Sequence, residues 1–138
     1  MKSLNKRIKQ PSNTFPWEIR KNNNDFKVWL RERNSYALFF DGASKGNPGL
    51  AGDGGVFMSA NGTVLSRYSW GLGTESNNIA EFCGLLQGLK TAISKGIVKL
   101  TVFGDSHLLI QAVTRKKHPT HIKLAQIYQK IQILSKKF

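Results

Sequence analysis

The sequence of 138 residues is poor in cysteine, in acidic side chains and in long apolar runs. Its single cysteine, Cys83, excludes an internal disulfide framework and a cysteine-based zinc site. Cys83 lies in a helical apolar pattern, which predicts a small core residue rather than a nucleophile. No apolar run approaches the length of a membrane span, and the basic N-terminus lacks the apolar region of a secretory signal. We expect an intracellular protein, nuclear or cytoplasmic, with organellar targeting as the alternative.

Acidic residues number 8 against 21 Lys and Arg, so the formal net charge is +13. Such an excess predicts a polyanionic partner, nucleic acid before membrane, and a merely soluble basic surface is the plainer alternative. Residues 106–138 contain seven Lys and Arg and no acid. Three histidines occur in the same region, where solvated surface roles are expected: His107, His118 and His121.

Residues 1–34 are polar and irregular, with nine Lys and Arg against three acids. This composition predicts a basic linker or arm that precedes a domain at 35–138. The arm contains Trp17 and Trp29. Each either docks on the domain or stacks on nucleic-acid bases, and docking is the favoured interpretation.

The domain begins with three β-prone segments. Alternation and turn signals, including Asn61-Gly62, predict an antiparallel meander of strands at 36–41, 54–59 and 64–70. The segment between the first two, GASKGNPG, is expected to be a turn-rich loop.

Helical periodicity follows. The predicted apolar stripe comprises Ile79, Phe82, Cys83, Leu86, Leu89 and Ile93, with cap candidates at 76–78 and an end at Gly96. A fourth strand at 98–104, a short helix at 107–114 and a last helix capped by Thr120 complete the pattern. The strand–helix–strand crossover places the fourth strand parallel to the first. We therefore predict an α/β fold with a mixed sheet of order 3-2-1-4 and flanking helices.

Three carboxylates are expected to meet at one edge of this sheet. Asp41 ends the first strand, Asp105 ends its parallel neighbour, and Glu81 is predicted in the first turn of the crossover helix. Clustered carboxylates repel one another unless a cation lies between them, and such oxygen ligands suit Mg²⁺ or Mn²⁺. Two ions roughly 4 Å apart would support phosphodiester cleavage. Three unrelated surface acids are the alternative.

Three motifs carry a family resemblance: FDGASKGNPG at 40–49, NNIAE at 77–81 and GDS at 104–106. In this order they resemble ribonuclease H, and more narrowly the ribonuclease H-like domains of plant retroelement reverse transcriptases. The resemblance implies that Asp41, Glu81 and Asp105 are the catalytic metal ligands, with Gly42 beside them in the metal site.

The same resemblance implies contacts to an RNA–DNA hybrid. Asn47, Asn77 and Asn78 are expected near the 2′-hydroxyls of the RNA strand, since an amide can donate to and accept from a hydroxyl. Helix capping by Asn77 and Asn78 is compatible with that role. Two further contacts are predicted at Gly46, which allows close approach of the backbone, and at Ser106. The basic loop of Arg115, Lys116 and Lys117 is also predicted to contact nucleic acid, and the alternative is a loop that only faces solvent.

The chain also departs from the family pattern. The family continues into a fifth strand and a last helix with a fourth carboxylate, so residues 35–138 are expected to be a C-terminally truncated domain. The fourth strand would then be an open edge, which predicts marginal stability and association.

Two function classes stay open at this point. The first is metal-dependent hydrolysis of the RNA strand of RNA–DNA hybrids. The second is a non-catalytic nucleic-acid-binding or tether module of a reverse-transcriptase-derived protein, with a reverse transcriptase domain in a longer parent chain as partner.

Overall fold

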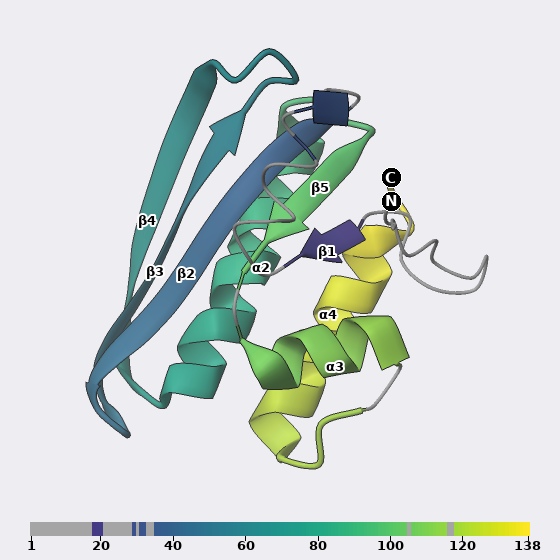
Figure 1. Cartoon of the computed structure of the whole chain (residues 1–138). Helices are drawn as coiled ribbons and strands as arrows, with labels where there is room; N and C mark the ends of the chain where they lie inside the picture. Colours follow the sequence, from purple (N-terminus) through teal and green to yellow (C-terminus); the bar gives the residue numbers. More distant parts are fainter. Residues whose placement is uncertain (1–17, 21–28, 30, 33–34, 105, 116–117) are drawn as a thin grey trace.

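The computed structural model describes residues 18–20, 29, 31–32, 35–104, 106–115 and 118–138. These residues form an α/β layered structure (Figure 1). Its elements in chain order are β1 (Glu18–Arg20), β2 (Tyr36–Gly46), β3 (Gly49–Met58), β4 (Val64–Glu75), α2 (Asn77–Ser94), β5 (Leu100–Phe103), α3 (His107–Arg115) and α4 (Ile122–Ser135).

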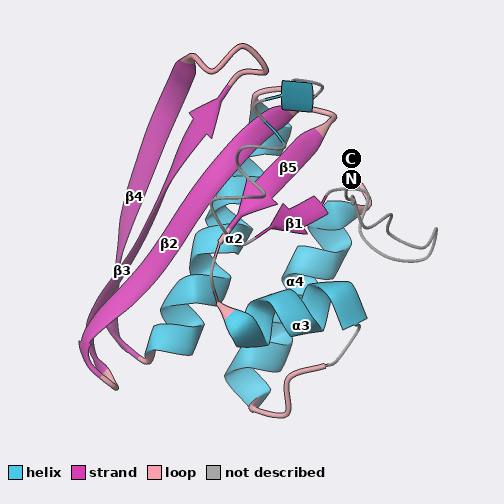
Figure 2. Ribbon diagram, in the orientation of Figure 1, coloured by secondary structure: helices cyan, strands magenta, loops and turns pink. Residues whose placement is uncertain are grey.

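The sheet has the order β1-β5-β2-β3-β4. Strands β2, β3 and β4 form the antiparallel meander, and β5 pairs with β2 in parallel, as the crossover through α2 predicts. Helix α2 packs against β2 and β3, and α4 packs against α2 (Figure 2). The α/β fold class and the order of the four predicted strands are therefore confirmed.

The loop predicted after Asp41 is wrong for most of its length. Strand β2 continues to Gly46 and pairs with β3 down to the Gly46–Gly49 pair, so only Asn47 and Pro48 form the turn. Small residues allow this tight hairpin. A Cβ on Gly49 would lie 1.6 Å from the Lys45 carbonyl oxygen, and Gly46 has a φ of 87°. The Asn47–Pro48 peptide is cis.

The predicted open edge on the fourth strand is also wrong. Strand β1, from the segment predicted to be a linker or arm, pairs in parallel with β5 along Glu18–Arg20. The pairing satisfies backbone groups of β5 on the side away from β2. The sheet edge formed by β4 has no neighbour among the described strands.

Trp29 confirms the docking expected of the N-terminal tryptophans, whereas Trp17 lies outside the described residues. The Trp29 side chain is 0% exposed and meets the Phe103 ring edge-on, with ring centroids 6.2 Å apart. Its indole N–H donates to the Ser35 carbonyl at 3.2 Å. Trp29, Ala37 and Phe103 form a small cluster of their own. Two pieces of residues 1–34 thus pack on the domain, while the boundary at 34/35 stays a prediction.

The main core lies between the sheet and the helices. It includes Phe40 and Phe57 from the sheet, Phe82 from α2 and Ile131 from α4. Cys83 packs against this core and is partly buried. None of the described helices is long and apolar enough to cross a membrane.

Two of the three helix boundaries predicted from capping residues are confirmed. Ser76 caps α2, and Gly96, with a φ of 74°, follows its C-terminal end. The cap of α4 is His121 rather than Thr120, and it makes no side-chain hydrogen bond. His118 and His121 are exposed, as expected, and the His118 ring meets Tyr128 edge-on at 5.1 Å. The side chain of His107 lies outside the described part.

Candidate active site

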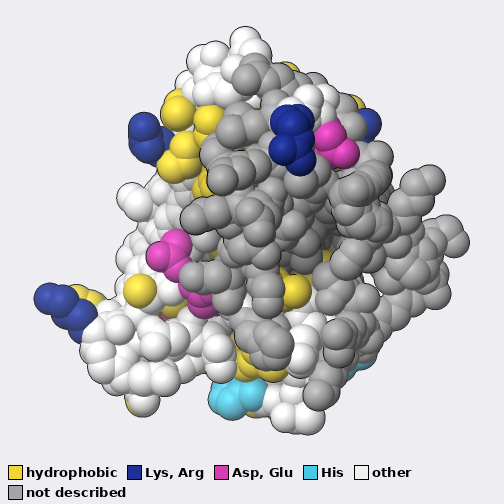
Figure 3. Space-filling model, viewed as in Figure 1, with side chains coloured by type: hydrophobic (Ala, Val, Ile, Leu, Met, Phe, Trp, Pro, Cys, Tyr) yellow, Lys and Arg dark blue, Asp and Glu magenta, His cyan; other side chains and the backbone are white. Residues whose placement is uncertain are grey.

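Two of the three predicted carboxylates meet at the backbone of Gly42. The Gly42 N–H donates to Asp41 Oδ1 at 2.9 Å and to Glu81 Oε1 at 2.8 Å. The Asp41 side chain is exposed, whereas Glu81 is only 8% exposed. Acidic side chains gather over the middle of β2 in Figure 3. The two carboxylates come from β2 and α2 and accept hydrogen bonds from the same N–H group.

Glycine is required at position 42 because α2 crosses β2 very closely there. A Cβ on Gly42 would lie 2.2 Å from the carbonyl carbon of Ala80. Gly84, one turn further along α2 than Ala80, is also close to β2, although less so, since its Cβ would lie 3.2 Å from the Asp41 carbonyl oxygen. The absence of both side chains brings the Glu81 carboxylate within reach of the Gly42 N–H.

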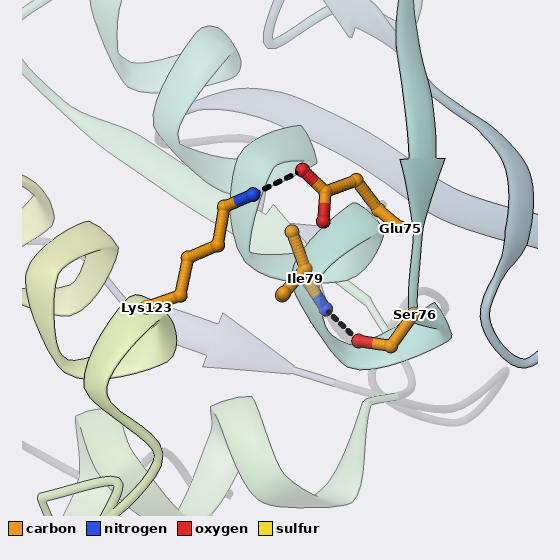
Figure 4. Close-up of polar contacts among 4 residues, drawn as sticks. All are labelled: Glu75, Ser76, Ile79 and Lys123. Carbon is orange, nitrogen blue, oxygen red and sulfur yellow. Dashed lines mark hydrogen bonds and ion pairs between the residues drawn. The ribbon is translucent and has the colours of Figure 1, made fainter.

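Glu81 does not lie in the first turn of α2, which corrects the sequence-based prediction. The helix begins at Asn77, and its first turn is capped by the Ser76 hydroxyl, which accepts from the Ile79 N–H at 3.2 Å (Figure 4). Glu81 is therefore past the unpaired N–H groups of the helix start. Its hydrogen bond to the Gly42 N–H comes from the neighbouring strand instead.

The side chains of Asn47 and Asn77, both predicted to contact RNA, are connected by hydrogen bonds through the backbone. Asn77 Oδ1 accepts from the Ser44 backbone N–H at 2.8 Å, and Asn47 Oδ1 accepts from the Asn77 backbone N–H at 3.1 Å. The Ser44 hydroxyl is within hydrogen-bond distance of Asn77 Oδ1, at 2.9 Å, and of the Gly46 carbonyl. Because a backbone N–H can only donate, the oxygen of each amide must face it. The NH₂ groups of Asn47 and Asn77 are therefore directed away from these bonds.

An open pocket of about 620 Å³ brings these groups together. It unites five residues predicted for metal or nucleic-acid binding with two residues of α3 that were not predicted. The lining residues are Gly42, Asn77, Asn78, Glu81, Ser106, Leu108 and Gln111. A carboxylate and several amides therefore face the same space.

Some predicted site residues are not placed. Asp105, Lys116 and Lys117 lie outside the described residues, as does the side chain of Arg115, although Ser106 lines the pocket. Within the described part, no three His, Cys, Asp or Glu side chains form a group that could hold a metal ion. The third predicted ligand, Asp105, lies outside that part.

Comparison with known proteins identifies the family. Residues 39–138 match the family described as reverse transcriptase-like. The chain belongs to this family. It has the ribonuclease H fold: the crystal structure of RNase H1 from Halobacterium salinarum superposes with a TM-score of 0.71 at 30% identity, covering 75% of this chain and 78% of that one.

A second relative is the bifunctional protein Rv2228c of Mycobacterium tuberculosis. It is 36% identical over 99 residues, which cover 71% of this chain and 27% of that protein. The structure of its N-terminal RNase H domain has a TM-score of 0.71 to this chain at 35% identity and covers 75% of each chain. The chain therefore spans about a quarter of the full length of this relative.

The ribonuclease H-like domain also uses residues that the sequence reading missed. Ser44 orients Asn77, and Gln111 lines the pocket from α3. Alternation along β2 would have placed Ser44 on the helix side with Leu38, Phe40 and Gly42, had the strand been extended to 46. No sequence pattern indicates that Gln111 faces the pocket, because its position depends on how α3 packs.

Asp53 is a buried carboxylate next to the site. It pairs with Gly42 across β2 and β3, is 5% exposed, and neither of its carboxylate oxygens has a hydrogen-bond partner in the described structure. Burial raises the pKa of Asp53 to about 6. Burial, and then the charge of Asp53, also raise the pKa of Tyr68, whose hydroxyl donates to the Gly84 carbonyl at 2.8 Å.

Proposed function

We propose that this ribonuclease H-like domain hydrolyses the RNA strand of RNA–DNA hybrids with the help of Mg²⁺ or Mn²⁺. The observation that supports this most directly is the convergence of Asp41 and Glu81 on the Gly42 N–H, in a pocket that Asn77 and Asn78 also line. The family relationship to ribonuclease H agrees with this reaction class.

The donor set suits a hard divalent cation. Two carboxylates that share one N–H donor repel each other in their ionised forms, and a cation between them would offset that repulsion. Carboxylate oxygens are the ligands that Mg²⁺ and Mn²⁺ prefer. Asp41 and Glu81 would hold the ion, with Asp105 as the third ligand that the family resemblance implies. A bound divalent ion supplies activation of the attacking water and stabilisation of the leaving oxygen.

The amides would recognise the RNA strand by donating hydrogen bonds. The oxygen of Asn77 is engaged by Ser44 and that of Asn47 by the Asn77 N–H, so both side chains offer NH₂ donors to a ligand. A ribose 2′-oxygen can accept such a bond, whereas a deoxyribose has no atom there to do so. This polarity favours RNA over DNA on the strand next to the pocket.

A substrate panel tests the proposal. The purified chain is incubated with a hybrid, an RNA duplex, a DNA duplex and single-stranded RNA, each with Mg²⁺, with Mn²⁺ and with a chelator. We expect cleavage of the hybrid's RNA strand only, and only with a metal ion. Salt-dependent binding of the hybrid by folded protein without any cleavage would contradict the proposal and indicate the binding or tether module instead.

A further inference from the structure

Helices α2 and α4, with a residue just past the end of α4, carry four lysines that we name the lysine face: Lys90, Lys123, Lys130 and Lys137. All four side chains are exposed. Lys123 forms an ion pair with Glu75 at the end of β4 (Figure 4). The other three make no ion pair within the described part of the chain.

Helix geometry places these lysines on one flank. Lys123, Lys130 and Lys137 are spaced by seven residues, close to two helical turns, so the first two project from the same side of α4 and the third follows just beyond its end. Lys90 has the same spacing from Cys83 on α2. The pKa of Cys83 is raised by burial and by Asp53 and Glu75, and Lys123 and Lys130 oppose this rise. These lysines thus lie near the Cys83 side of α2.

The lysine face is separate from the candidate active site. Glu81 and Cys83 are two residues apart on α2, which turns their side chains about 200° from each other around the helix axis. The carboxylates therefore lie on one side of α2 and the lysine face on nearly the opposite side. Helix α2 therefore separates the pocket from the lysine face, and a ligand bound in the pocket does not contact both surfaces across the helix.

The charge of this region is strongly one-sided. Residues 76–138 contain ten Lys and Arg but only two acids, Glu81 and Asp105, and both belong to the candidate metal site. Glu75 lies beside the lysine face, but its carboxylate is already paired with Lys123. The repulsion between the remaining lysines is relieved when a polyanion neutralises them.

We propose that the lysine face binds the sugar–phosphate backbone of a nucleic acid outside the cleavage pocket. Phosphate contacts of this kind need positive charges in a row and no specific base readout. A membrane surface is the competing partner that the test must exclude, because α4 also exposes Ile122 and Ile133. The lysine row favours nucleic acid, because evenly spaced charges match a chain of phosphates and no continuous apolar face accompanies them. The proposal does not depend on hydrolysis and concerns a second surface.

The test uses the full chain in a chelator, so that no cleavage occurs. Binding of a fluorescent hybrid, of a DNA duplex and of phosphatidylserine vesicles is measured between about 50 and 200 mM salt. The test variant is Lys90→Gln/Lys130→Gln. The matched control, Arg67→Gln/Lys99→Gln, removes the same charge from exposed positions elsewhere. Arg67 points away from the helices, because its neighbour Tyr68 bonds to Gly84 of α2.

We expect the slope of log affinity against log salt to fall by about 2 in the test variant and to remain near the wild-type value in the control. Equal slopes in all three proteins, an equal loss in both variants, or a loss confined to binding of phosphatidylserine vesicles would overturn the proposal. Cleavage with Mg²⁺ is measured separately. A chain that cuts but shows an unchanged slope rejects the lysine face alone, whereas a chain that does not cut but shows the reduced slope rejects the hydrolytic function alone.

Discussion

Asp41 and Glu81 accept hydrogen bonds from one and the same N–H group, that of Gly42. The first residue lies on strand β2 and the second lies 40 positions later, in the second turn of α2. Their meeting depends on a helix that approaches the strand without any side chain in between. The geometry of the carboxylate pair is therefore a property of backbone packing as much as of the two acids.

Gly42→Ala tests this dependence. The added Cβ would collide with the Ala80 backbone, so we expect a loss of about 1–3 kcal/mol in the free energy of unfolding and a loss of hybrid cleavage. Gly71→Ala is the matched control, because its Cβ would meet nothing within 4 Å. Urea unfolding and the cleavage assay measure both effects. Equal behaviour of the two variants would show that α2 can shift at no cost.

Asn77 is expected to act as a donor to a 2′-oxygen. Hybrids carrying 2′-fluoro sugars, which retain an acceptor, should bind more tightly than hybrids carrying 2′-deoxy sugars by about 2- to 10-fold, the value of one hydrogen bond. Because fluorine also alters the sugar pucker, Asn77→Ala is the control and should reduce this difference. Competition binding without metal measures it. A difference that is the same in wild type and variant would reject the donor role of Asn77.

Asp53 should make the domain less stable as the pH rises. Its folded-state pKa, about 6, lies above the usual value of 3.8, so the folded state holds the proton more tightly and the penalty develops between these two pH values. Above pH 6 the penalty amounts to about 3 kcal/mol. We expect Asp53→Ala to raise the free energy of unfolding at pH 8 relative to wild type.

The same comparison at low pH is the control for Asp53. Near pH 4 the carboxyl is mostly protonated in the folded state, and the advantage of the variant over wild type should shrink. An advantage that is constant from pH 4 to pH 8 would show that burial of the charged form is not its cause. Chemical unfolding at each pH provides the data.

Trp29 should contribute strongly to stability. Its side chain is fully buried against Phe103 and its indole N–H is bonded to Ser35, so Trp29→Ala should cost about 3–5 kcal/mol. Trp70→Ala is the matched control, because Trp70 is 53% exposed and should cost much less. Thermal and urea unfolding compare the variants. A small effect at Trp29 would support an independent domain that begins at residue 35.

The sequence predicted the regular elements well because their patterns are local. Alternation identified the meander, and the stripe that includes Phe82 and Leu86 identified α2. It failed for β1, since three residues in a polar segment carry no strand pattern and pair only through the distant strand β5. It also failed for the second half of β2, where small residues were taken for a loop although they allow close pairing with β3.

The sequence predicted which residues form the candidate site better than it predicted how they are arranged. Asp41 and Glu81 were expected to converge, yet the shared N–H of Gly42 and the orienting role of Ser44 depend on how closely α2 and β2 pack. That distance follows from the absence of a side chain at Gly42, which a motif does not reveal. The unpaired burial of Asp53 likewise arises from the three-dimensional packing of β3 under α2.

The most direct test of the central claim is the rate of hybrid cleavage by Asp41→Asn compared with wild type at saturating Mg²⁺. Glu75→Gln is the matched control, because it also neutralises one acid but lies on the lysine side of the domain and should keep near wild-type activity. We predict that Asp41→Asn remains folded, with unchanged hybrid binding in a chelator, and loses more than about 100-fold in rate, since an electrostatic contact to the reacting centre is removed. Wild-type cleavage by Asp41→Asn would contradict the claim that Asp41 and Glu81 form the catalytic centre.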